Sequence, residues 1–268
     1  MAHAGHQIWR NASFRDIELQ RGSFVRHHQV NDHFHDSYQF VLVEYGGRHF
    51  KYRNSKENVG CGRLTLIQPG EVHSGMCSAD LGSSFLTLHL PPKYVTELEP
   101  GLIGKMETLP FSIEYEIART CFRALHTSLE GGLDRSELDD LILKLVGAIC
   151  QFPVENTSRV APAKERIERA RAYIHEHYRQ TCSLETLAEL SCLSKYHFVR
   201  EFTKAYGTSP IVYRNAVRIM EARKLLAAGI APIAVSAELG FADQSHFGRT
   251  FRAHAGFTPA AYKKVAFS

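Results

Sequence analysis

Three histidines in the N-terminal half of the chain have a spacing that could bring their side chains to one site. His33 and His35 are two residues apart, so on a β-strand they face the same side, and His73 follows a Pro-Gly turn. Three neutral imidazoles could bind zinc, iron or another transition metal and leave coordination positions open. Gln39, a polar residue nearby in the sequence, compensates the charge of a metal ion poorly because its amide is neutral. Three interpretations stay open: histidines that line a small-molecule pocket or shape turns, which we favour, a bound metal ion, or a catalytic metal.

The C-terminal third of the chain contains the same motif twice. Residues 188–213 align without a gap on 237–262 after a shift of 49 residues, and ten of the 26 positions are identical. Each copy is predicted to form a short helix, a tight turn and a second helix, with Ser183, Ser194 and Asp243 as helix caps. Helix-turn-helix is the unit that places its second helix in the major groove of DNA.

The second helix of each copy has an apolar face and a polar face. On a wheel with about 100° per residue, Phe198 and Phe202 mark the buried side and Arg200 points away from it. Arg249 has the same outward position in the second copy, and arginine suits bidentate contact with guanine or phosphate. One outward arginine is usually only solvated, so its repetition in both copies is what favours a DNA contact. We predict DNA contacts from Lys195, Tyr196, Val199, Arg200, Thr203, Gln244, Ser245, Arg249 and Arg252.

The charges of the chain are unevenly distributed. The net charge is +4, but from Lys164 onward there are 16 Lys and Arg against 9 Asp and Glu, so the earlier part is net negative. A basic C-terminal part is expected to meet a polyanion. The six cysteines form no Cys-x-x-Cys pair, which argues against a zinc ribbon and against a disulfide framework.

The period of the hydrophobic pattern changes along the chain. Short strand-like runs from 27 to 90 predict a β-barrel or sandwich, and we expect the Gly-Gly pair at 46–47 to end one strand. The next apolar residues recur at helical spacing and predict a helical hairpin, which either packs on its own barrel or forms a dimer seam, the alternative that we favour. The expected parts are a barrel in 1–112, the hairpin in 113–152, a linker in 153–163 and a helical domain in 164–268, with helix-turn-helix units at 184–206 and 233–256.

The C-terminal motifs resemble the DNA-binding domain of the AraC/XylS family of transcription regulators. The first copy carries the resemblance in SLETLAEL from Ser183, SKYHFVREF from Ser194 and GTSP at 207–210. The second copy carries it in IAVSAELGFADQSHFGRTF and GFTP, within 233–259. One departure is Cys192, where the family often has a glycine before the turn.

The N-terminal half resembles the effector-binding domain of the same family, a cupin-like double-stranded β-helix. The resemblance rests on HFHDSYQ at 33–39 and GRLTLIQPGEVH at 62–73. Metal-binding cupins have a histidine where His73 stands, but usually a glutamate where this chain has Gln39. The family implies a regulator whose ligand-binding domain controls how a dimer sits on DNA. We predict that the effector site includes His33, His35, Tyr38, Gln39, Tyr52 and His73.

We therefore expect an α+β chain of two domains, a cupin-like barrel with a helical hairpin and an all-α domain of two helix-turn-helix motifs. The expected function is sequence-specific transcription regulation under the control of a small-molecule effector, without enzymatic activity or cofactor. The alternative is a metal-dependent cupin enzyme with a DNA-binding tail, whose ligands would be His33, His35 and His73. Expected partners are double-stranded DNA, an effector, a second copy of the chain and RNA polymerase. The sequence has no leader-like or membrane-spanning apolar run, so we expect a cytoplasmic protein that is found at the nucleoid when bound to DNA.

Overall fold

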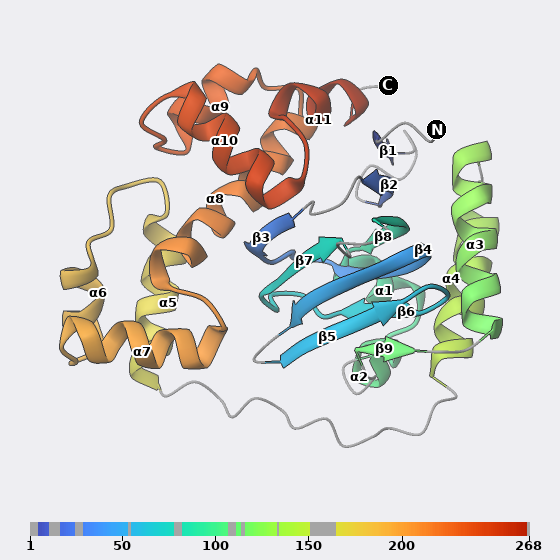
Figure 1. The fold of residues 1–268 in the computed structure, drawn as a ribbon, viewed down its shortest axis with the longest axis horizontal. Helices are drawn as coiled ribbons and strands as arrows, with labels where there is room; N and C mark the ends of the chain where they lie inside the picture. The colour runs from blue at the N-terminus through green and yellow to red at the C-terminus, as the bar shows by residue number, and fades with distance from the viewer. Residues whose placement is uncertain are drawn as a thin grey trace.

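A computed structural model of the 268-residue chain describes residues 5–10, 17–24, 29–52, 55–77, 82–106, 111–113, 116–132, 134–150 and 165–266. It consists of a curled β-sheet domain with helices on one side and an all-helical domain built around the long helix α8 (Figure 1). The two-domain α+β architecture expected from the sequence is thereby confirmed. The expected linker lies outside the described residues. No helix in the described part of the chain is long and apolar enough to cross a membrane.

The N-terminal domain is a sheet that curls around one long strand, β4. In chain order the described strands are β1 (Gly5–Arg10), β2 (Glu18–Phe24), β3 (Gln29–His33), β4 (Tyr38–Tyr52), β5 (Ser55–Gly60), β6 (Leu64–Ile67), β7 (His73–Cys77), β8 (Ser83–Leu90) and β9 (Ser112–Ile113). The first half of β4 pairs with β6 and β8, and its second half pairs with β5 and β7. β1 and β2 extend the sheet beyond β8, in a part of the chain where the sequence analysis identified no strand.

Strand β4 continues through the glycine pair at which the sequence analysis expected a strand to end. Gly46 has a φ of +69°, and a Cβ atom there would lie 2.1 Å from the carbonyl oxygen of Gly82. The register of β4 against β8 shifts between Val43 and Tyr45. Gly46 therefore lets the strand bulge and bend from one half of the barrel to the other. The prediction was wrong because glycine marks bulges as well as turns.

The bulge also decides which side chains of β4 face the inside of the barrel. Before it, Phe40 packs toward the helices, whereas Val41 and Val43 belong to a separate cluster on the other face of the sheet. After the bulge, Phe50 and Tyr52 belong to this second cluster. These positions are even-numbered, whereas Val41 and Val43 are odd-numbered, so the bulge exchanges the positions that face inward and outward. A regular alternation of period two therefore does not describe the whole strand.

Four helices cover the outer face of the sheet. They are α1 (Pro92–Leu98), α2 (Leu102–Met106), α3 (Glu116–Gly131) and α4 (Arg135–Ile149). Helix α4 begins with a capping box, in which Asp134 and Glu137 each accept the other's backbone N–H. The apolar stripe of α4, including Leu138 and Ile142, lies in one core with Phe40 of β4. The predicted hairpin is present, and its apolar stripe packs on its own barrel.

The C-terminal domain contains the two predicted helix-turn-helix units. Its helices are α5 (Glu165–His177), α6 (Leu184–Leu190), α7 (Lys195–Tyr206), α8 (Pro210–Ala227), α9 (Pro232–Glu238), α10 (Gln244–Ala255) and α11 (Pro259–Ala266). The side chains of Ser183, Ser194 and Asp243 accept backbone N–H groups at the starts of α6, α7 and α10, as predicted. Phe198 is buried in the core of the first unit and Phe247 in the core of the second, and α8 contributes to both.

The turns of the two units differ by one residue. The left-handed residue after α6 is Cys192, with a φ of +52°, and the left-handed residue after α9 is Gly240, with a φ of +69°. Because the repeat shift is 49 residues, Gly240 corresponds to Ser191 and not to Cys192. The helices of the two copies therefore align without a gap, but the left-handed residue of the turn comes one residue later in the first copy than in the second. A cysteine in this conformation carries a cost of about 1–2 kcal/mol that glycine avoids.

We predict that Gly240→Ala destabilises the protein by about 2–3 kcal/mol. The added Cβ would lie 1.9 Å from the carbonyl oxygen of Arg179 and would force a left-handed alanine. The matched control is Gly248→Ala on α10, where a Cβ meets no atom within 4 Å and helix propensity favours alanine by about 1 kcal/mol. Denaturant unfolding of both variants measures the difference. A Gly240→Ala variant as stable as Gly248→Ala would contradict this account of the turn.

Candidate functional site

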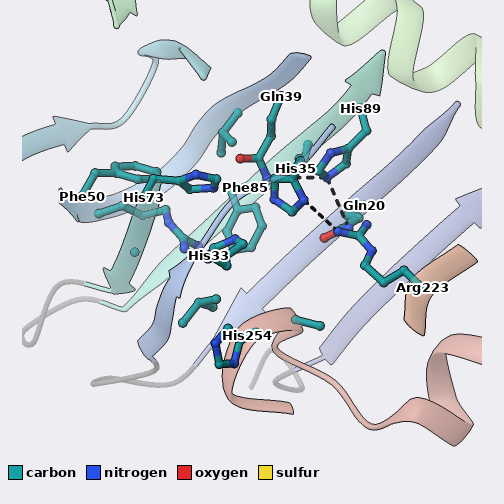
Figure 2. Close-up of a pocket in the computed structure, with 16 residues that line it drawn as sticks. Gln20, His33, His35, Gln39, Phe50, His73, Phe85, His89, Arg223 and His254 are labelled. Atoms are coloured by element: carbon teal, nitrogen blue, oxygen red, sulfur yellow. Dashed lines mark hydrogen bonds between the residues drawn. The ribbon is translucent and has the colours of Figure 1, made fainter. Parts of the chain in front are cut away.

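A pocket opens inside the barrel at the side that faces the C-terminal domain. Its empty volume, including the open mouth, is about 550 Å³. Strands β2, β3, β4, β7 and β8 supply most of the wall, and α8 and α10 add Arg223 and His254 from the other domain (Figure 2). The pocket is therefore enclosed by both domains, and its shape depends on how they are docked.

Four of the six predicted effector-site residues line this pocket. They are His33, His35, Gln39 and His73. Tyr38 does not line it, because it faces the opposite side of β4 from Gln39 and is buried in the core beneath the helices. Tyr52 faces inward but stacks on Phe111, with ring centroids 4.5 Å apart, and does not reach the pocket. The structure therefore does not bring these two tyrosines together with the histidines: Tyr38 lies on the other face of β4 by strand alternation, and Tyr52 lies farther along the strand.

Several pocket residues were not assigned to the site from the sequence. Gln20 lies on β2, where no strand was predicted, and Arg48 follows the bulge that reverses the parity of β4. His89 shares a face of β8 with Thr87, opposite Leu86 and Leu88, which belong to the core beneath the helices. Arg223 and His254 come from the other domain, and no local signal in the sequence connects them to the barrel.

Hydrogen bonds fix the orientation of the three clustered histidines. His33 Nδ1 lies 2.7 Å from the carbonyl oxygen of Asn31, and His73 Nδ1 lies 3.0 Å from that of Glu71. A carbonyl only accepts, so both imidazoles donate from Nδ1 and keep a lone pair on Nε2. His35 is reversed, since its Nδ1 accepts from Arg223 NH1 at 3.0 Å.

Burial keeps these imidazoles neutral. It lowers the pKa of His73 from its ordinary value of 6.5 to about 4. Burial also lowers the pKa of His33 and that of His35. The neighbouring His73 lowers the pKa of His33 further, and His89 lowers that of His35 further. Near pH 7 the pocket therefore presents uncharged ring nitrogens, and its positive charge comes from Arg48 and Arg223.

A metal ion fits the histidine cluster poorly. The potential ligand atoms of His33, His35 and His73 lie within 4.8 Å of one another, and imidazole nitrogen suits zinc and related metals. However, Arg223 occupies the Nδ1 lone pair of His35, and the cluster contains no carboxylate. Arg48 adds a second guanidinium to the same pocket. A divalent cation would therefore enter a site that already has positive charge and lacks an anionic ligand.

The two domains meet at a buried ion pair beside the pocket. Glu18 of β2 binds the guanidinium of Arg223 on α8 and accepts a hydrogen bond of 2.7 Å from Tyr262 on α11. Gln20 also donates to Glu18, at 2.5 Å. Burial opposes the charge of Arg223, but Glu18 and then Tyr262 outweigh it and raise the pKa of Arg223 above its ordinary value. We call Glu18, Arg223 and Tyr262 the domain latch.

Weaker contacts surround the domain latch. Phe34 stacks on Tyr213 of α8 with centroids 4.9 Å apart. Lys51 donates to the backbone oxygen of Gly207 at 2.7 Å, and Lys224 pairs with Asp36 at 2.9 Å on the surface. In Figure 1, α11 lies over β1, and β3 lies between the sheet and α10.

Most of the predicted DNA-contacting residues are exposed. Tyr196 of α7 is 81% exposed, a high value for an aromatic side chain in a folded domain. Val199 is the exception, because it is partly buried against the core of the first unit and its role as a contact is not supported. Lys195 pairs with Glu185 at 2.6 Å, so DNA would have to compete for it. The other exposed positions are Arg200, Thr203, Gln244, Ser245, Arg249 and Arg252.

Comparison with known protein families identifies both halves of the chain. Residues 15–146 match the AraC-like ligand binding domain, and residues 187–264 match a helix-turn-helix domain. The first match contains the wall of the pocket that the barrel supplies, and the second contains Arg223, His254 and helices α7 and α10.

Known relatives match most of the chain. The HTH-type transcriptional regulator YbfI of Bacillus subtilis is 28% identical over 223 residues, which cover 80% of each protein. The HTH-type transcriptional activator RhaS of Escherichia fergusonii is 24% identical over 90% of this chain and 88% of its own. The crystal structure of ToxT from Vibrio cholerae O395 matches 94% of this chain and 98% of its own with a TM-score of 0.59. At 11% identity this last likeness shows a shared fold.

We predict that the free energy of unfolding falls as the pH drops from about 6.5 to about 4. In this range an unfolded chain protonates His73 but the folded pocket does not, so protons favour unfolding. His73 alone contributes a loss of about 3 kcal/mol. Denaturant titrations across this range should show a flatter profile for His73→Gln. The control is His49→Gln, an exposed histidine of the same barrel, which should keep the native profile. Equal profiles for all three proteins would contradict the prediction.

Proposed function

Because the chain belongs to the AraC/XylS family of transcription regulators, with a ligand-binding domain and a helix-turn-helix domain, we propose that its effector acts through the domain latch. The observation that carries this proposal is the double role of Arg223. Its guanidinium lines the pocket and binds His35, and it also binds Glu18 at the domain contact. A ligand that contacts Arg223 would therefore change the stability of one domain arrangement relative to others.

The energetic requirement is a difference in ligand affinity between arrangements. A ligand shifts the equilibrium only as far as it binds one arrangement better than another. The pocket wall supplied by α8 and α10 provides that difference, because Arg223 and His254 leave the pocket when the domains separate. Residues of α8 also pack in the cores of both helix-turn-helix units, so a shift at Arg223 would move both units together.

We propose that α7 and α10 are the recognition helices. Their exposed N-terminal halves would enter adjacent segments of the major groove, with Arg200 and Arg249 as base or phosphate contacts. The exposure of these side chains and the basic charge of the domain support this assignment. Tyr196 would add an aromatic contact at the groove edge.

We propose that the protein has no catalytic activity and no resident metal. The relatives are transcription regulators, and the histidine cluster lacks the carboxylate that would compensate a metal ion beside two arginines. No feature of the described residues favours the alternative of a metal-dependent enzyme over a small-molecule pocket.

We also propose that the protein works as a homodimer on DNA in the cytoplasm and contacts RNA polymerase. The predicted dimer seam needs revision, because Leu138 and its neighbours on α4 are buried against their own barrel. The outward face of α3 remains, and Ile117 on that face is 53% exposed. A seam between two copies would therefore use α3 rather than the apolar stripe of α4.

Arg249→Ala is expected to weaken binding to a selected operator by about 1–3 kcal/mol and to relax specificity at one base position. The operator would first be recovered by in vitro selection with the native protein. The matched control is Arg123→Ala, which removes the same charge from α3, on the far side of the barrel from α10 (Figure 1). Quantitative DNA binding at fixed salt measures both. If Arg249→Ala and Arg123→Ala have equal affinities for operator and random DNA, Arg249 does not read a base.

Tyr262→Phe is expected to loosen the domain contact without disturbing the second helix-turn-helix core. It removes only the hydroxyl that donates to Glu18, a bond to a charged acceptor that contributes about 1.5–3 kcal/mol. Hydrogen exchange should therefore rise in α8 and β2. Lys224→Ala is the control, because it breaks an exposed pair on the same helix, and such pairs contribute about 1 kcal/mol or less. Unchanged exchange in Tyr262→Phe would refute the role of the latch.

A further inference from the structure

Arg48 of β4 is a buried cation at the wall of the pocket. The residue is 6% exposed, and its Nε and NH1 atoms are buried without a hydrogen-bond partner among the described residues. The guanidinium carbon lies 4.1 Å from the ring centroid of Phe85 and 5.4 Å from that of Phe50. Aromatic faces attract a cation but offer no acceptor in the plane of its N–H groups. Arg48 therefore keeps unused donors beside a cavity.

Two other arginines with little exposure, Arg223 and Arg218, are differently placed. Arg223 is paired with Glu18. Arg218, which is 3% exposed, donates to the backbone oxygens of Tyr178 and Arg179 at 2.6 Å and 3.2 Å. Both guanidinium groups thus find acceptors within the protein, as buried charges normally do. Arg48 departs from this pattern.

The environment of Arg48 does not compensate its charge. Burial lowers the pKa of Arg48 to about 10. Cys77, which pairs with Arg48 across β4 and β7, raises this pKa but does not offset the effect of burial. Among the described residues no carboxylate forms an ion pair with it. An uncompensated buried charge destabilises a fold by several kcal/mol, so a counter-charge supplied from outside the chain would stabilise this one.

The pocket wall is shaped around this side chain. A Cβ atom at position 75 would lie 2.8 Å from Arg48 NH2, so only Gly75 leaves the guanidinium its present position without displacement. His73 lines the same pocket, with a buried Nε2 that lacks a hydrogen-bond partner in the described structure. Two side chains that line one cavity, Arg48 and His73, thus carry buried polar atoms without a partner among the described residues.

We infer that the effector is a small organic anion whose carboxylate pairs with Arg48 inside the barrel. The inference rests on the proposed function, because it assigns the chemistry of the ligand that the same pocket would take. The N–H groups of Nε and Nη1 lie on different edges of the guanidinium, and either one can donate a charge-assisted hydrogen bond to a carboxylate. A carboxylate brings the negative charge that the described wall does not supply to Arg48.

The histidines extend this recognition to a second group on the ligand. His33 and His73 donate from Nδ1 to backbone oxygens, so their Nε2 atoms accept. An acceptor is matched by a hydroxyl donor on the ligand, not by a second carboxylate. A small hydroxy acid would therefore satisfy both sides of the pocket at once.

The first test uses the ligand-free protein and needs no knowledge of the effector. Arg48→Met replaces the guanidinium beside Phe85 with an apolar group and removes the uncompensated charge, so the thermal midpoint should rise by about 2–4 °C. Arg123→Met, an exposed arginine on α3, is the control and should leave the midpoint unchanged. A midpoint that falls in Arg48→Met would show that Arg48 is a structural residue and would overturn the inference.

The second test measures ligand binding by the native protein with a chelator present, which excludes binding through a metal ion. The probes are lactate, 3-hydroxybutyrate and mandelate, each beside its neutral amide. A carboxylate, but not its amide, should raise the thermal midpoint, and Arg48→Met should abolish the shift. Amides that act as strongly as the acids, or no shift with any acid, would overturn the inference.

The outcome separates this inference from the proposed role of the domain latch. If a carboxylate binds through Arg48 but leaves DNA affinity unchanged, the ligand chemistry assigned to the pocket stands and the latch proposal fails. If a neutral ligand binds independently of Arg48 and changes DNA affinity, the latch proposal stands and the effector class is wrong.

Discussion

The arrangement of this protein depends on one buried ion pair, Glu18 with Arg223, which joins residues 205 positions apart in the sequence. Each charge would be costly in the interior without the other, because separation of a buried pair leaves an uncompensated ion. Tyr262 and Gln20 also donate hydrogen bonds to the carboxylate of Glu18 and restrict its orientation. The pair therefore specifies one docking of the domains more strongly than the apolar stacking of Phe34 on Tyr213 could do alone.

The pocket and the DNA-binding units both depend on this docking. Arg223 contributes to the pocket wall on one side and extends from α8 on the other, and α8 connects the cores of the two helix-turn-helix units. Under the proposed function, a ligand inside the barrel would lie beside Arg223 of α8, the helix that connects the two units. No transmission through the rest of the barrel is needed.

Local signals in the sequence predicted the helical domain well. The caps at Ser194 and Asp243 and the buried Phe198 and Phe247 follow from helix periodicity and capping chemistry, which act within a few residues. The pocket was predicted only in part. The bulge between Val43 and Tyr45 reverses the parity of β4, so alternation could not identify Arg48, and no local pattern relates Arg223 to Glu18. The contacts that couple the domains are long-range and are specified by the tertiary fold.

The most direct measurement is a double-mutant cycle on operator affinity with Glu18→Gln, Arg223→Gln and the combined variant. If the ion pair restrains the recognition helices, each single variant should change the operator Kd by about fivefold or more, and the double variant should change it by less than the product of the two single effects, because all three break one contact. A Kd that equals the native value in all three variants, with the fold intact, would show that the domain contact has no part in DNA binding.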